Sequence, residues 1–433
     1  MGYQKDGFPM EMASKIGHIK LIENPTIRAM LESFESIAPG DPKDFPPASG
    51  NLDLSIDGGI QQVIVVDGGH QIVPNKIRPE RQIGFIQVAA MMLKLKDIQE
   101  LIQKPLTDPR DVARMLHGTT YSVLAALPIA GVHLHGHSIR DTSRESVFRF
   151  LETYGLLKTL SDLVYRRWET NPQDPPHMNC LRCGQDMELP RFHMEFSCPG
   201  CSERHRLSDY LGLFDMDSQE RGRAETISGF RTILEALTLF SFILRHRSKP
   251  VIMGKTLFLL DGPLTLRAGL SRLVEPIRSL LEEQKRSGNP IYLLGVEKSG
   301  DIHDFASSYG SFLPEVGDYF IPSTQFIVEN IRGQSFSEGD YRNRVNYGAK
   351  AIIRISSNHL LVVDIPTGKF LLTPTISDLI GFSEIAKALS KLQSSAYPDA
   401  LIPIVMANSE ASISNQPSNE ILSQYVDRIL NNE

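Results

Sequence analysis

Two aspartates each follow a short apolar run and precede a glycine. Asp67 ends the run VIVVD and Asp261 ends the run TLFLLD. A carboxylate at the tip of a buried strand is held on rigid backbone, and the glycine lets a phosphate or a metal ion approach closely. Mg²⁺ and Mn²⁺ prefer carboxylate oxygens and can activate water against a phosphodiester. Either Asp-Gly pair alone is more typical of a simple turn, but both together favour a metal-dependent hydrolase.

A third carboxylate is expected from the helix that precedes the Asp261 strand. That strand, 256–260, rises by roughly 17 Å, and a helix covers the same rise in about eleven residues. Counting back from the helix end near Arg245 leads to Glu235, which stands in the apolar stretch TILEALTLF. Glu225 is the reserve candidate, because it overshoots unless the helix is tilted. An exposed helix carboxylate without a ligand remains the alternative for either residue.

A lysine follows a third apolar run, LLGVEKSG, directly after its end. Lys298 in that position can neutralise the charge of a scissile phosphate. Glu297 beside it is a weaker candidate metal ligand. A solvated loop lysine is the alternative interpretation of this motif.

All four cysteines of the chain form two CxxC pairs, Cys180 with Cys183 and Cys198 with Cys201. Two such pairs in an intracellular protein indicate metal rather than disulfides, and the spacing is typical of a zinc ribbon. Four thiolates leave no open position for water, so a structural Zn²⁺ site is predicted. The surrounding arginines leave contact with nucleic acid or a partner open.

Three alternate histidines, His133, His135 and His137, would share one face of an extended strand and could bind a metal there. No acidic cluster lies near them in the sequence. A polar strand or loop is therefore the preferred interpretation, with a metal-dependent amidohydrolase as the alternative.

The elements that position these residues predict a mixed α/β fold. Residues 1–50 are expected to form an N-terminal helical segment and a linker rich in proline and glycine, and 51–433 the main domain. Apolar runs at 61–69, 82–96, 255–262 and 289–300 predict strands, and 224–247 predicts a helix. The stretch 98–175 is expected to be helical, and a helical insertion at 105–215 is expected to hold the zinc ribbon at about 176–206.

Composition excludes several classes of protein. The chain has 433 residues, 41% of them hydrophobic, and a net charge of −6, which argues against a uniformly basic nucleic-acid coat but not against a basic cleft. The N-terminus lacks the apolar core of a secretory signal. A cytoplasmic protein that does not span a membrane is predicted.

The ordered set VVDGG, IGFIQVAA, FLLDGPL, LLGVEKSG and YPDALIPIVMANSEASI resembles the NurA family of nucleases over roughly 55–105 and 220–425. The resemblance implies an RNase H-like core, cleavage of DNA with Mn²⁺ or Mg²⁺, a homodimer, and a HerA-type hexameric translocase ATPase as partner. It implies a role in DNA end processing or phage defence.

By this resemblance Asp67 matches the family's first-strand aspartate, Asp261 the aspartate of its DG-L motif, and Lys298 the lysine after the third strand. Glu235 is taken for the helix glutamate. The family usually has a histidine in the last motif where this chain has Asn408, which cannot act as a general acid or base near neutral pH. Tyr397 is a candidate match for a nearby tyrosine. The alternative function is a catalytically weak adaptor or DNA-binding subunit that docks on an ATPase ring.

Overall fold

The computed structural model describes residues 24–33, 46–102, 120–170, 175–215, 223–337, 341–394, 397–413 and 418–430. The chain divides into two compact units, 1–46 and 47–433, close to the predicted boundary at residue 50. Within the first unit the described element is helix α2 (Pro25–Glu32), which begins at the capping side chain of Asn24. The predicted helix over the remainder of the N-terminal segment lies outside the described residues.

Nine strands of the second unit form one mixed sheet, in the order β1-β11-β12-β13-β10-β9-β2-β3-β4. Strands β2, β9 and β10 run parallel to one another, and each of the other neighbouring pairs is antiparallel. The strand bounds are β1 Gly50–Asn51, β2 Gln62–Pro74, β3 Gln82–Lys94, β4 Thr120–Ala130, β9 Thr256–Asp261, β10 Tyr292–Glu297, β11 Asp318–Phe320, β12 Gly348–Ser356 and β13 His359–Pro366. The mixed α/β prediction is confirmed.

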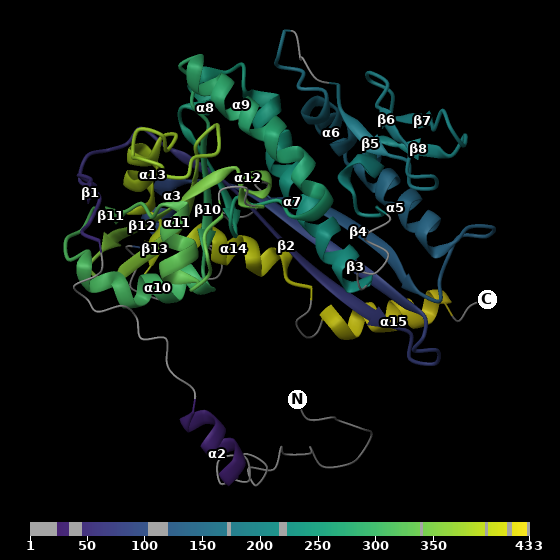
Figure 1. Ribbon diagram of the computed structural model, residues 1–433, viewed down its shortest axis with the longest axis horizontal. Helices are drawn as coiled ribbons and strands as arrows, with labels where there is room; N and C mark the ends of the chain where they lie inside the picture. Colours follow the sequence, from purple (N-terminus) through teal and green to yellow (C-terminus); the bar gives the residue numbers. More distant parts are fainter. Residues whose placement is uncertain are drawn as a thin grey trace. The chain divides into compact units, whose positions relative to one another are not determined.

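The first strand differs from its prediction at one end. The expectation that it ends at Asp67 is wrong, because β2 continues through Gly68 and Gly69 to Pro74. Its partner β3 is equally long and pairs with it from Gln62 to Pro74, so the ladder hydrogen bonds carry both glycines through the strand. The two strands form a long arm that extends past the end of β9 (Figure 1).

The predicted helical stretch 98–175 is wrong for Thr120–Ala130, which forms β4 at one edge of the main sheet. The expected insertion at 105–215 is therefore not a separate helical region, because its residues Thr120–Ala130 belong to the main sheet. Pro128 is tolerated there because an edge strand has one unpaired side. The expected helix at 108–116 lies outside the described residues.

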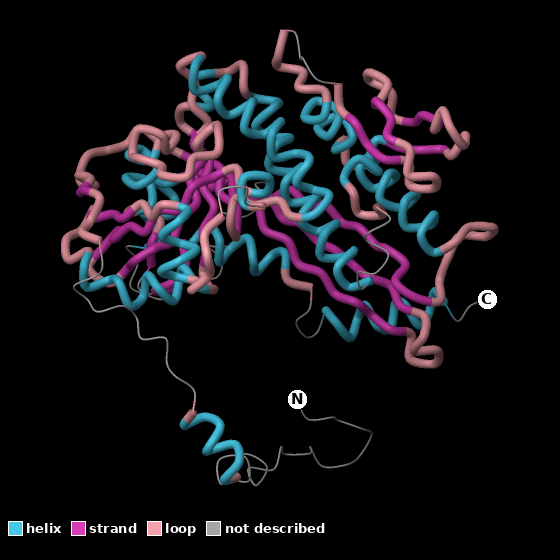
Figure 2. Tube along the Cα trace, viewed as in Figure 1, coloured by secondary structure: helices cyan, strands magenta, loops and turns pink. Residues whose placement is uncertain are grey.

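Helices cover both faces of the sheet (Figure 2). Helix α7 (Arg223–His246) packs against β2, β3 and β4 on one face, as predicted for 224–247. Helices α13 (Phe382–Leu389) and α14 (Ile402–Ala411) belong to a separate core cluster on the other face. The alternating residues of β2 divide accordingly, since Ile64 and Val66 lie in the α7 cluster and Val63 and Val65 in the α14 cluster.

The remaining elements lie around this frame. The helices are α3 Leu95–Ile102, α5 Ile139–Thr153, α6 Leu156–Val164, α8 Pro250–Met253, α9 Val274–Arg286, α10 Asp301–Tyr309, α11 Thr324–Phe326, α12 Arg342–Val345 and α15 Ser418–Leu430. Short 3-10 helices span Leu207–Leu211, Ala268–Leu273 and Gly310–Phe312, and a π-helical turn spans Ile327–Ile331. The short strands are β5 His177–Asn179, β6 Asp186–Glu188, β7 Glu195–Ser197, β8 Arg204–Arg206, β14 Gln393–Ser394 and β15 Tyr397–Leu401.

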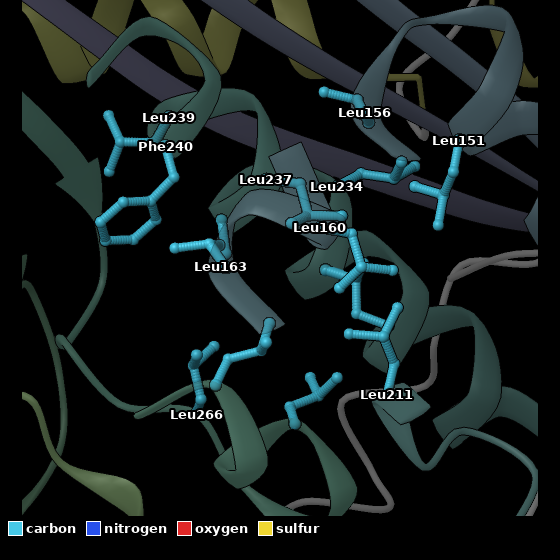
Figure 3. Close-up of a cluster of buried hydrophobic side chains, with 14 of the residues drawn as sticks. Leu151, Leu156, Leu160, Leu163, Leu211, Leu234, Leu237, Leu239, Phe240 and Leu266 are labelled. Atoms are coloured by element: carbon cyan, nitrogen blue, oxygen red, sulfur yellow. The ribbon is translucent and has the colours of Figure 1, made fainter. Parts of the chain in front are cut away.

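The core on the α7 face joins helices that are far apart in the sequence. Leucines of α5, α6 and α7 meet Leu211 and Leu266 there, and all of them are buried (Figure 3). The segment Glu225–His246 of α7 has the length and the mean hydropathy, 1.5, of a membrane span, but 61% of it is buried inside the protein. It is the one such helix among the described residues, and its burial is typical of a core helix.

The residues after Asp261 predict a long amphipathic helix with Pro276 in its interior, where a proline should kink it. The helix α9 instead begins at Val274, which places Pro276 in its first turn, where a backbone N–H has no helical acceptor to lose. The segment before it forms the 3-10 helix at Ala268–Leu273. The proline therefore marks the start of α9 and does not interrupt it.

Candidate functional site

The two aspartates lie side by side in the sheet. Strands β2 and β9 run parallel, and Val66 pairs with Leu260, so Asp67 and Asp261 are the next residues on adjacent strands. Neighbouring strands are about 4.8 Å apart. Asp67 is 6% exposed, and its Oδ1 accepts a hydrogen bond of 2.7 Å from the backbone N–H of Gly68. The pair therefore presents two carboxylates at the point where β9 ends.

Glu235 reaches this point from α7. It is 7% exposed, and its Oε1 would lie 2.6 Å from a Cβ on Gly68, a distance that real Cβ atoms do not show. The glycine is therefore what lets the glutamate approach β2. The other predicted helix carboxylate, Glu225, is exposed and lies ten residues earlier, about 15 Å along the helix. Of the two glutamates, Glu235 is the one beside the aspartates.

Two basic side chains neutralise the carboxylates. Lys298 Nζ donates a hydrogen bond of 2.7 Å to Asp261 Oδ2, and Arg231 lies 3.2 Å from Glu235 Oε1. Arg231 also donates a hydrogen bond of 2.8 Å to the carbonyl oxygen of Gly68. The structure thus brings together the four predicted residues Asp67, Glu235, Asp261 and Lys298, and adds Arg231.

The surroundings shift the ionisation of two of these groups. Burial, together with the negative charge of Asp261, raises the pKa of Asp67 to about 6. Burial raises the pKa of Glu235 to about 8; the charges of Asp67 and Asp261 add to this rise, and Arg231 opposes it. Both acids therefore hold protons at a higher pH than an exposed carboxylate does. A divalent cation would replace these protons with its own charge.

A cavity of about 620 Å³ opens beside Glu235 and Asp261. Its wall includes Arg231 and Glu225 of α7, Arg267 of the following loop, and the segment 211–213. Hard divalent ions bind through carboxylate oxygens of the kind this wall presents. Among the described residues, the four cysteines form a group whose ligand atoms all lie within 4.8 Å of one another. The three carboxylates do not form such a close group.

A buried ion network supports the loop after Asp261. Lys350 of β12 bonds both Glu297 of β10 and Asp364 of β13, the latter at 2.7 Å. Asp364 is 2% exposed and accepts a hydrogen bond of 2.9 Å from the backbone N–H of Leu264. Burial raises the pKa of Glu297. This residue, a weaker candidate metal ligand, is thus held in an ion pair with Lys350.

The four cysteines form a compact group that fits a zinc ion. Cys180 and Cys201 Sγ are 3.6 Å apart, and Cys183 and Cys198 Sγ are 3.7 Å apart. Tetrahedral Zn²⁺ with bonds of about 2.3 Å separates its sulfur ligands by about 3.8 Å. Each CxxC pair lies between the two strands of a hairpin, β5–β6 or β7–β8, as in the predicted ribbon.

The knuckles are held by backbone hydrogen bonds. The N–H of Arg182 lies 3.4 Å from Cys180 Sγ, and the N–H of Gly200 lies 3.4 Å from Cys198 Sγ. His205 is fully buried, and its Nε2 lies 3.3 Å from Cys180 Sγ. Such contacts orient thiolate ligands and stabilise their charge.

The other predicted residues lie elsewhere. His133, His135 and His137 are exposed in the turn after β4 and form no strand. Asn408 is exposed near the C-terminal end of α14, whose Ala411 carbonyl oxygen would lie 2.3 Å from a Cβ on Gly69. The side chain of Tyr397 lies outside the described residues.

Sequence reasoning missed three features of the site. Arg231 could have been found from its position one helical turn before Glu235, since residues four apart share a helix face. Lys350 and Asp364 lie far along the chain from the motifs that they support and carry no local signal. No protein-family model matches the chain, and no curated protein matches its sequence.

Proposed function

We propose that this protein is a divalent-metal-dependent deoxyribonuclease of the NurA type. The observation that carries the proposal is the adjacency of Asp67 and Asp261 on parallel strands, with Glu235 reaching them beside Gly68. Three carboxylates at one sheet position supply the oxygen donors that Mn²⁺ and Mg²⁺ prefer. Acids with raised pKa values close to a cavity are typical of a functional site.

The strand order supports an RNase H-like core. In the series β4-β3-β2-β9-β10, the first three strands are antiparallel and the last two run parallel to β2. An RNase H-like core has this 3-2-1-4-5 arrangement, and α7 occupies the connection between its third and fourth strands. In this interpretation β2 supplies the first aspartate, α7 the glutamate, and β9 the second aspartate.

The residues of the chain have separate roles in this reaction. Asp67, Glu235 and Asp261 would hold the divalent ions, which would supply an activated water and stabilise the charge that develops on the phosphate. Asp67 and Glu235 would have to be ionised to serve as ligands. Lys298, which donates a hydrogen bond to Asp261 in the structure, lies where its charge would offset that of the scissile phosphate. Arg231 keeps Glu235 directed at β2.

The partners follow from the family resemblance. DNA is the proposed substrate, a HerA-type hexameric ATPase the proposed partner, and a cytoplasmic homodimer the proposed form. DNA end processing and phage defence are both compatible with the residues of the site. The four-cysteine group is proposed to hold a structural Zn²⁺, separate from the catalytic Mn²⁺ or Mg²⁺.

Cleavage of single- and double-stranded DNA with Mn²⁺, in the presence and absence of the ATPase, tests the proposal. Asp67→Asn is expected to lower the rate at least about 100-fold, because it removes a charged ligand worth several kcal/mol to the transition state. Asp97→Asn, on the exposed surface of α3, is the matched control and should cleave as the wild type does. Equal rates for wild type and Asp67→Asn would refute the proposed hydrolysis.

A non-catalytic adaptor is the second candidate function. The ion pairs Lys298–Asp261 and Arg231–Glu235 favour it, because they neutralise two of the carboxylates without a metal. The exposed Asn408 in place of a histidine points the same way. In that case the wild type would bind the ATPase ring, and DNA cleavage would stay at the level of Asp67→Asn.

A further inference from the structure

A second cavity, of about 460 Å³, adjoins the candidate active site. The two cavities share three wall residues, Pro263, Thr265 and Arg267, in the loop that follows Asp261. Tyr341 closes this wall, since its hydroxyl oxygen accepts a hydrogen bond of 3.2 Å from the backbone N–H of Ala268. The two cavities therefore lie on either side of this loop.

The second cavity has an excess of basic side chains. Four cationic side chains line it, and the carboxylate among its lining residues is Glu297; Lys350 pairs with both Glu297 and the neighbouring Asp364. The four cations are Arg267, Arg332, Arg342 and Lys350. Arg332 is paired with the exposed carboxylate of Asp301 at 3.3 Å. Positive charge thus exceeds negative charge on the cavity wall.

Two of these arginines repel each other. Burial, together with the charge of Arg332, lowers the pKa of Arg342. Like charges held in a shared pocket repel each other and raise the free energy of the empty site. An anion bound between them reduces this repulsion. The planar guanidinium groups match the oxygens of a phosphate.

The remaining wall suits the rest of a nucleotide. Tyr341 is 46% exposed, and Phe370 lies in the same lining. Pro322, Ile302 and Ile327 add apolar surface. Bases and sugars stack on surfaces of this kind while arginines hold the backbone.

We propose that this cavity is a phosphate-binding subsite, in which Arg332 and Arg342 hold a backbone phosphate of a nucleic-acid strand next to the phosphodiester at Asp67 and Asp261. The inference rests on the proposed nuclease function and adds the part of the substrate that lies beyond the scissile bond. The bound phosphate is either an internal phosphodiester or a terminal phosphate.

Binding of a fluorescent oligothymidylate to the full-length protein, in buffer without added Mn²⁺ or Mg²⁺, tests the subsite without cleavage and leaves the proposed Zn²⁺ in place. Arg332→Gln and Arg342→Gln are each expected to weaken binding at least about tenfold. Each should also lower the slope of log K against log salt by about 0.7, the value for one lost contact to a single strand. Arg286→Gln, an exposed arginine of α9 paired with Glu282, is the matched control and should change neither quantity.

A comparison of 5′-phosphorylated and 5′-hydroxyl oligonucleotides separates the two sources of phosphate. Tighter binding of the phosphorylated form, lost in Arg342→Gln, identifies a terminal phosphate. Equal binding of both forms, weakened by either substitution, identifies an internal one. Wild-type affinity and salt slope in both arginine variants would overturn the subsite, as would a wild type that binds no oligonucleotide.

The same measurements distinguish this proposal from the nuclease itself. Arginine-dependent binding by a wild type that cleaves no DNA would refute hydrolysis and leave the binding subsite standing. Melting temperatures of the two variants, compared with Arg286→Gln, show whether each is folded. Arg332 is partly exposed, so its replacement keeps the test decisive if Arg342→Gln is unstable.

Discussion

Glu235 is a buried carboxylic acid of α7 beside Arg231 and the two aspartates, and its burial and these neighbours decide when it ionises. Its pKa is about 8 in the folded protein, raised mainly by burial, and returns to its ordinary value near 4.5 on unfolding. A raised folded-state pKa stabilises the protein below the unfolded pKa, and this stability is lost as the pH rises through the folded pKa. Without divalent metal, the free energy of unfolding should therefore fall between pH 4.5 and 8, by roughly 2–5 kcal/mol from this group.

Glu235→Gln is expected to remove most of this pH dependence, because the amide keeps the shape of the side chain and does not ionise. Urea unfolding from pH 4.5 to 8, in buffer without added Mn²⁺ or Mg²⁺, measures it. Asp67 should also lower the stability as the pH rises, but over a narrower pH range, since its pKa is raised only to about 6. Glu225→Gln, at the exposed start of α7, is the control and should follow the wild type. An unchanged slope in Glu235→Gln would contradict the assignment of a raised pKa to this residue.

Between elements, the contact of α7 with β2 depends on Gly68. A methyl group there would lie 2.6 Å from Glu235 Oε1 and 3.1 Å from Arg231 Cγ. Gly68→Ala should therefore displace Glu235 and lower the free energy of unfolding by about 1–3 kcal/mol, the usual cost of overpacking. Denaturant unfolding measures the stability, and DNA cleavage with Mn²⁺ should fall in parallel.

A double-mutant cycle isolates the contact. In a Glu235→Ala background the carboxylate no longer occupies the space beside β2, so Gly68→Ala should cost less than it does in the wild type. The remaining cost measures the contact with Arg231. Additive effects of the two substitutions would show that the glycine does not serve the approach of Glu235.

The spacing of apolar residues predicted most of the helices and strands, because that spacing reflects which residues each element buries. Buried apolar runs marked β9 and β10, and three- and four-residue spacing marked α5 and α6. Strand β4 was missed because its residues, TYSVLAALPIA, include alanines and leucines that also suit a helix. Its buried residues alternate with less buried ones, as expected of a strand. Pro128 and the edge position nevertheless weaken the strand signal in the sequence.

The site was predictable only where its residues terminate apolar runs. Asp67 and Asp261 stand out for that reason, although the length of β2 beyond Asp67 depends on pairing with β3, which a local motif does not encode. The second cavity was not foreseen. Its arginines come from 267, 332 and 342 and meet only because β12 and the loop after β9 lie together in the fold.

At the scale of the whole molecule, the four-cysteine ribbon is joined to the cavity beside Glu235. Cys180 and Cys198 are buried in the same core cluster as α7. The chain leaves the ribbon through the 3-10 helix 207–211 and reaches Gly212, where an added Cβ would lie 2.5 Å from the Cα of Gly269. Both glycines line the cavity beside Glu235. The fold of the ribbon therefore fixes one wall of the site.

A buried salt bridge strengthens this connection. Arg144 of α5 is 4% exposed and donates two hydrogen bonds to Asp209, at 3.1 and 2.8 Å. Asp209 follows the ribbon. Burial alone would raise its pKa, but the hydrogen bonds from Arg144 and the nearby His205 imidazole, 3.6 Å away, lower it. A charge pair of this kind is costly to break from one side. The ribbon is thus tied to α5 as well as to the cavity wall.

Loss of the ribbon metal should consequently damage the site as well as the ribbon. The paired substitution of Cys183 and Cys201 by serine is expected to abolish zinc binding, measured as one Zn²⁺ per wild-type chain by elemental analysis. Because metal binding is linked to folding, the melting temperature should fall by at least about 5 °C. Limited proteolysis should then cut first within 175–215, and oligonucleotide binding should weaken as the wall at 211–213 loosens.

Asp186→Asn, an exposed substitution on β6 of the same ribbon, provides the comparison, since the carboxylate pairs with the exposed His177 and lies away from the sulfur ligands. It should keep the zinc, the melting temperature and the binding of the wild type. If the cysteine variant loses zinc but retains wild-type binding and cleavage, the ribbon is an independent module. Coupled losses would instead show that the metal holds the cavity wall in place, because α5, the ribbon and the loop at Gly269 then loosen together.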